Sequence, residues 1–126
     1  MPKEPRTFDL EDRLIDFGVR VIRLAEVLPK TRAGNHIAGQ IIRSGTSPAS
    51  NYGEAQSAES RADFIHKVQV CLKELRETKV WLQMTAKAKL VKSASNLNPL
   101  IDENNQFISI FVTSVKTARQ KNRETS

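Results

Sequence analysis

Few side chains in this 126-residue sequence have the types and spacing that catalysis or metal binding requires. The one cysteine, Cys71, lies among apolar residues at helical spacing, which favours a core position over a reactive thiolate. His36 and His66 are not part of a zinc or di-iron motif. Asp63-x-x-His66 resembles the Glu-x-x-His motif of di-iron proteins only weakly. No glycine-rich phosphate loop or nucleophile elbow is present. We therefore expect neither an enzyme nor a protein that uses a metal or another cofactor.

The elements that position these side chains are helices, because apolar residues recur at alternating spacings of four and three. The expected core positions are Leu10, Leu14, Phe17, Val21, Leu24 and Leu28; Phe64, Val68, Cys71, Leu75, Thr78 and Leu82; and Leu97, Ile101, Asn104, Ile108, Phe111, Val115 and Ala118. Together with a less regular second segment, the pattern predicts helices at about 8–29, 33–57, 61–90 and 98–121. Short connections between long helices predict an all-α, up-down-up-down four-helix bundle, one domain over residues 1–126.

The second helix contains a proline in its middle, within Gly45-Thr-Ser-Pro48. Proline removes a backbone hydrogen bond and clashes with the preceding turn, so we expect one kinked helix, with two shorter helices as the alternative. The residues expected on its core face are Ile37, Ile41, Pro48, Tyr52 and Ala55.

Polar side chains form a stripe beside the core face of both the second and the third helix. We call these ten residues the polar seam: Arg43, Ser47, Asn51, Glu54, Asp63, Lys67, Val70, Glu74, Glu77 and Trp81. Three interpretations remain open for them: solvated faces with pairs such as Asp63–Lys67, a hydrogen-bonded seam between the two helices, or an interface between subunits. Tryptophan is a common interface anchor, which favours one of the last two interpretations.

The net charge is +6, and the surplus lies entirely in residues 61–126, which carry twelve basic and six acidic residues. In an up-down bundle the first and third loops meet at one end. That end should gather the loop cluster: Lys30, Arg32, Lys87, Lys89 and Lys92. The other end should carry the tail cluster: Lys116, Arg119, Lys121 and Arg123. Such clusters favour salt-sensitive binding to nucleic-acid phosphates, although lysines that keep a loop soluble are an equal alternative.

Specific motifs in residues 40–82 carry a family resemblance. They are Ile42-Arg-Ser-Gly-Thr-Ser-Pro-Ala-Ser-Asn51-Tyr-Gly-Glu54, Ser60-Arg-Ala-Asp63-Phe64-Ile-His66-Lys67, Leu72-Lys73-Glu74-Leu-Arg-Glu77-Thr78 and Trp81-Leu82. This stretch resembles the bacterial four helix bundle protein family, whose founding members are encoded in intervening sequences of large-subunit ribosomal RNA genes. Distant relatives of that family are the accessory variability proteins of diversity-generating retroelements. The resemblance implies a four-helix bundle that assembles into a homopentameric ring.

Pattern and resemblance together predict an oligomeric scaffold that binds the phosphate backbone of RNA or DNA through its basic clusters. The alternative is an adaptor for a partner protein, such as a reverse transcriptase, whose basic character is incidental. We expect a cytoplasmic protein that does not enter a membrane, because no secretory signal is visible and the uncharged run 44–53 is rich in Ser, Thr, Asn and Gly.

Overall fold

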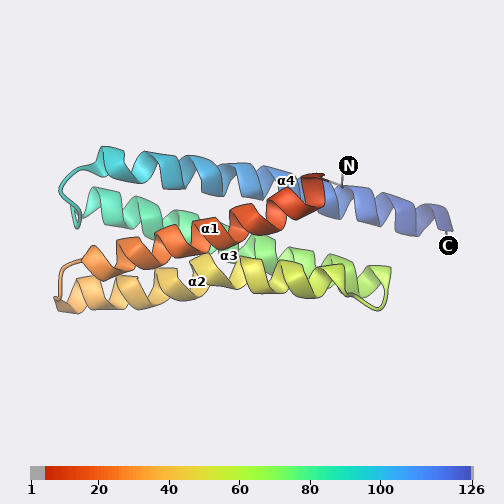
Figure 1. Cartoon of the computed structure of the whole chain (residues 1–126), viewed down its shortest axis with the longest axis horizontal. Helices are drawn as coiled ribbons and strands as arrows, with labels where there is room; N and C mark the ends of the chain where they lie inside the picture. The colour runs from red at the N-terminus through yellow and green to blue at the C-terminus, as the bar shows by residue number, and fades with distance from the viewer. Residues whose placement is uncertain (1–4, 126) are drawn as a thin grey trace.

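The computed structural model describes the backbone of residues 5–125 and the side chains of residues 10–121. The helices are α1 (Pro5–Val27), α2 (Arg32–Gln56), α3 (Arg61–Lys87) and α4 (Asn98–Thr125), with a short 3-10 helix, η1 (Ala94–Leu97), before α4. Successive helices reverse direction, so the α1–α2 and α3–α4 loops lie at one end, at the left of Figure 1. The α2–α3 loop lies at the opposite end. The prediction of an all-α four-helix bundle is confirmed.

Local sequence explains where α2 and α3 begin. Thr31 and Ser60 accept hydrogen bonds from the amides of Gly34 and Asp63, both at 3.0 Å, and so cap α2 and α3. α2 runs through Pro48 as a single helix rather than as two shorter ones. Each of the four expected ranges agrees with the observed helix to within four residues at either end.

The α3 end was expected at residue 90, which is wrong, because the helix stops at Lys87. Lys89 adopts a left-handed conformation with φ 56°, and the amides of Lys89 and Leu90 bond back to the carbonyls of Ala86 and Thr85. This is a Schellman motif with lysine where glycine is usual. A motif without glycine gives no sequence signal, which explains the overlong prediction.

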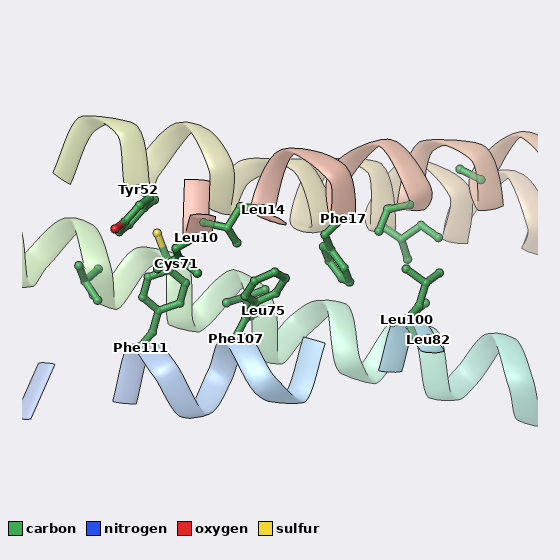
Figure 2. Close-up of a cluster of buried hydrophobic side chains, with 14 of the residues drawn as sticks. Leu10, Leu14, Phe17, Tyr52, Cys71, Leu75, Leu82, Leu100, Phe107 and Phe111 are labelled. Carbon is green, nitrogen blue, oxygen red and sulfur yellow. The ribbon is translucent and has the colours of Figure 1, made fainter. Parts of the chain in front are cut away.

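The core lies along the whole length of the bundle and is drawn from all four helices. Figure 2 shows Phe17 of α1 and Phe107 of α4 meeting between the helices, with ring centroids 5.5 Å apart in an edge-to-face arrangement. Tyr52 and Phe111 form a second aromatic pair at 5.7 Å. The expected core faces of α1, α2 and α3 are buried or half-buried in the structure.

The buried face of α4 includes two residues that the prediction did not contain. Leu100 and Phe107 are buried, whereas Ile101 and Ile108 are only half-buried. Both faces of this helix are apolar at helical spacing, and the contact of Phe107 with α1 selects between them. Spacing within one helix could not make that choice.

Candidate functional site

The middle of the polar seam consists of ion pairs that join α2 to α3. Arg43 donates through Nη1 to Glu74 Oε1 at 2.8 Å and through Nη2 to Glu77 Oε2. The indole Nε1 of Trp81 donates to the same oxygen of Glu77 at 3.2 Å. The Glu74 side chain is 12% exposed and that of Arg43 is 50% exposed. Arg43 therefore covers a largely buried carboxylate from the solvent side, and its hydrogen bond with Glu74 raises the pKa of its guanidinium.

A second ion pair lies nearer the α2–α3 loop. Lys67 Nζ donates to Glu54 Oε1 at 2.6 Å, and this bond raises the pKa of Lys67. Asp63 acts on Lys67 only through the electrostatic attraction of its charge, as the weakest of the causes of that shift. The expected Asp63–Lys67 pair is thus secondary to a pair that bridges two helices.

Between the ion pairs and the core, Ser44 and Thr78 are fully buried, and their hydroxyls are 2.8 Å apart and hydrogen bonded. The Cys71 thiol donates to the backbone carbonyl of Pro48 at 3.5 Å, which adds a further bond between α2 and α3. Sequence analysis placed Thr78 in the core and missed Ser44. A small polar residue beside Gly45 is the only signal that could have found it, because a close helix contact favours small side chains.

Two members of the seam bond within their own helix instead of across it. Asn51 Nδ2 donates to the hydroxyl of Ser47 at 2.8 Å and to its backbone carbonyl at 3.1 Å. Val70, half-buried on α3, has no polar atom that could pair with them. The described seam therefore bridges α2 and α3 inside one subunit through Arg43, Glu54 and their partners.

The loop cluster is exposed, and its members extend from the two loops that share one end of the bundle (Figure 1). Within the described part of the chain, Lys30, Arg32, Lys87, Lys89 and Lys92 form no ion pair; Lys30 donates only to a backbone carbonyl, at 3.4 Å. This is the opposite of the seam, where each cation faces a carboxylate.

Two cations at the same end were missed by sequence analysis. Arg20 and Arg23 of α1 are exposed and line the same hollow as Lys92. Their spacing of three places both on one side of α1, but only the packing of α1 beside α4 shows that this side faces the α3–α4 loop.

The tail cluster lies towards the other end of the bundle. Lys116, Arg119 and Lys121 are exposed on α4, whereas the side chain of Arg123 lies outside the described residues. Lys121 and Arg61 line a hollow of about 410 Å³ whose floor is Phe64. The tail cations are thus spread along a helix rather than gathered from several elements.

Cys71 and His36, two of the residues whose types could support chemistry, both pack against neighbouring residues. Burial raises the pKa of the Cys71 thiol to about 12, which keeps the thiol protonated at neutral pH. His36 packs edge-on against Trp81 with ring centroids 5.8 Å apart. Among residues 10–121 no three His, Cys, Asp or Glu side chains are grouped as a metal site would need. Nor does any described helix combine the length and apolar character of a bilayer crossing.

Known proteins with this sequence pattern and fold establish the family. The model of the 23S rRNA-intervening sequence protein family matches residues 6–113. The chain belongs to this family. A solved structure from Bacteroides thetaiotaomicron, described as a protein of unknown function from the S23 ribosomal protein family, is 30% identical with a TM-score of 0.78. The similarity covers 84% of this chain and 97% of that one. No curated protein matches the chain.

The family match confirms the resemblance seen in residues 40–82 and extends it. The matched residues 6–113 contain the whole polar seam and the whole loop cluster. The tail cluster begins at Lys116, beyond the match. Of the two basic groups, only the loop cluster belongs to the part of the chain that the family model describes.

Proposed function

We propose that this family member is a non-enzymatic, oligomeric scaffold of the cytoplasm that binds the phosphate backbone of RNA or DNA through the loop cluster. The observation that carries the proposal is the exposed group of unpaired cations at one end of the bundle. Arg20 and Arg23 enlarge that group beyond the five residues found from sequence.

Unpaired cations matter because binding energy at a phosphate backbone comes largely from the release of condensed counterions. A cation that already faces a carboxylate, such as Arg43, contributes little to that release. Glu26 and Asp102 are exposed near the loop end, and neither forms an ion pair within the described residues. Asp16 and Glu103 lie further from the loops and share a hollow with Arg20 and Arg23.

Self-association would strengthen the positive electrostatic potential at the loop end, because each subunit of a ring would contribute the same loop cluster. Support comes from the implied homopentamer of the family and from an apolar stripe on the outer side of α1. Ile15, Val19 and Ile22 are exposed at spacings of four and three, which is typical of a helix that packs on a partner. Light scattering at micromolar concentration tests this part of the proposal, and a 14.2 kDa monomer would contradict it.

The binding experiment compares two triple variants that remove the same charge. Lys87, Lys89 and Lys92 are replaced by Gln in one variant, and Lys116, Arg119 and Lys121 in the other. Affinity for a single-stranded RNA and for a DNA duplex is measured between about 50 and 200 mM salt. We expect the first variant to bind more weakly and to lose up to about two units of the log–log salt slope on single strands.

We expect the tail variant to bind like the unmodified protein. The reverse result would move the site to the tail cluster. Equal, salt-independent binding by all three proteins would reject phosphate recognition and favour the second candidate, an adaptor that docks a partner protein on the α1 stripe of Ile15, Val19 and Ile22. That candidate rests on the exposure of the stripe.

A further inference from the structure

A hollow with an apolar floor lies between α1 and α4 at the loop end, apart from the polar seam. α1 packs extensively on α2 but touches α4 only narrowly, and the two diverge towards this end (Figure 1). The hollow has a volume of about 570 Å³, within the range of small-molecule sites. Its apolar lining consists of Leu24, Val27, Leu90, Val91, Leu97 and Leu100.

The charged groups that line this hollow are all cationic. Arg20 and Arg23 come from α1 and Lys92 from the α3–α4 loop, and no carboxylate lines the hollow. None of the three forms an ion pair within the described residues. An apolar floor beside three unpaired cations is complementary to a ligand that has an apolar body and an anionic head.

The length of the hollow argues against a long peptide or a helix as the occupant. Its α1 wall runs from Arg20 to Val27, which is about 10 Å along a helix. Further along α1, Arg13 pairs with Glu103 of α4 at 2.9 Å and lies 5.0 Å from the centre of the Phe107 ring. This bridge joins the two helices about two turns before the hollow begins, and Arg20 and Arg23 also line a second hollow on that side, together with Asp16 and Glu103. The space fits one apolar group of moderate size.

We propose that this hollow binds a small organic anion with an apolar body, of the chemical class of a medium-chain carboxylate. The hydrocarbon contacts Leu24, Leu90 and Leu100, and the carboxylate lies among Arg20, Arg23 and Lys92. The site shares Arg20, Arg23 and Lys92 with the proposed nucleic-acid surface, but its specificity comes from the apolar lining, which a phosphate backbone cannot use, and octanoate binding is measured without nucleic acid.

The test measures binding of octanoate to the full chain without nucleic acid. Octanoate, below its micellar concentration, displaces the fluorescent probe 1-anilinonaphthalene-8-sulfonate; acetate and 1-octanol serve as probes that lack the apolar body or the charge. Val27→Glu places a carboxylate at the hollow, and because Val27 is 71% exposed the fold is not disturbed. Arg23→Gln removes one cation. Val80→Glu and Arg76→Gln, at exposed sites on α3, are the matched controls.

We expect octanoate to bind about threefold or more weakly to each of the two hollow variants and unchanged to both controls. Acetate and 1-octanol should compete at least about tenfold less well than octanoate. Equal loss in the controls, equal competition by 1-octanol, or no saturable octanoate binding at all would overturn the proposal. Binding of an acidic peptide in place of octanoate would overturn it too and would assign the hollow to a protein partner.

Discussion

The ion pair of Arg43 and Glu74 provides the sharpest test of the polar seam as the element that holds α2 against α3. Replacing Arg43 by Met keeps most of its aliphatic stem and removes the guanidinium. Glu74, only 12% exposed, is then left without its cation, and Glu77 retains only the indole of Trp81. Breaking a fully buried pair costs about 3–5 kcal/mol, whereas fully exposed pairs contribute about 0–1 kcal/mol.

Arg43 is half-exposed, so solvent screens the pair. The cost of breaking the pair should therefore lie closer to that of an exposed pair than to that of a buried one. We expect Arg43→Met to lower the free energy of unfolding by about 1–2 kcal/mol, or the melting temperature by about 3–8 °C. A double-mutant cycle with Glu74→Gln should give a coupling of about 1 kcal/mol. Urea unfolding at one fixed protein concentration measures all four proteins.

The pair of Lys67 and Glu54 is the internal control, because Glu54 is 58% exposed and solvent screens that pair more strongly. The cycle of Lys67→Met with Glu54→Gln should give a smaller coupling than the Arg43 cycle. A coupling for Arg43 and Glu74 that is indistinguishable from zero, or smaller than that of the control pair, would refute the view that the seam stabilises the α2–α3 hairpin.

Three further predictions concern single positions. A Cβ at Gly45 would lie 2.8 Å from a methyl of Val21, so Gly45→Ala should lower the melting temperature. A Cβ at Gly39 would have nothing within 4 Å, so Gly39→Ala should raise unfolding stability by about 0.5–1 kcal/mol. Folding raises the pKa of Cys71 to about 12, so above about pH 8.5, the ordinary pKa of a thiol, the unfolded chain loses this proton first and unfolding stability should fall. The fall should be smaller in Cys71→Ala, and labelling of the thiol at neutral pH should require unfolding. Asn104 is buried; its Nδ2 donates to the backbone carbonyl of Leu75 at 2.9 Å, but its Oδ1 has no partner among the described residues. Asn104→Leu should therefore raise unfolding stability by about 1 kcal/mol, and a loss of stability would show that the bond to Leu75 outweighs the cost of the unpaired oxygen.

The polar seam could be predicted in outline because a helical hairpin brings together residues equally distant from its turn. Arg43 and Glu77 each lie 17 residues from Ser60, and Glu54 and Lys67 lie six and seven residues from it. The spacing of the stripe and the position of the turn at Ser57–Ser60 therefore determine which residues of α2 and α3 face each other. The same rule places Val70 opposite Asn51, which explains why Asn51 bonds within α2 instead.

The α1–α4 side could not be predicted in this way, since these two helices are not consecutive. Their relative position depends on how α2 and α3 pack between them, which no local spacing encodes. The apolar face of α4 and the location of Arg20 and Arg23 beside Lys92 both depend on it. The prediction of the α4 core therefore omitted Leu100 and Phe107, and the hollow was not foreseen.

The two groups of cations can be separated by experiment because the fold gives them different surroundings. Arg43 and Lys67 face carboxylates across a helix contact, so their loss should change unfolding stability and leave the salt dependence of RNA binding unchanged. Lys87 and Lys92 face solvent at a loop, so their loss should change that salt dependence and leave stability unchanged. If Arg43→Met altered RNA affinity while the protein remained fully folded, this division would be contradicted. Such a result would mean that a cation already paired with Glu74 still contacts phosphate.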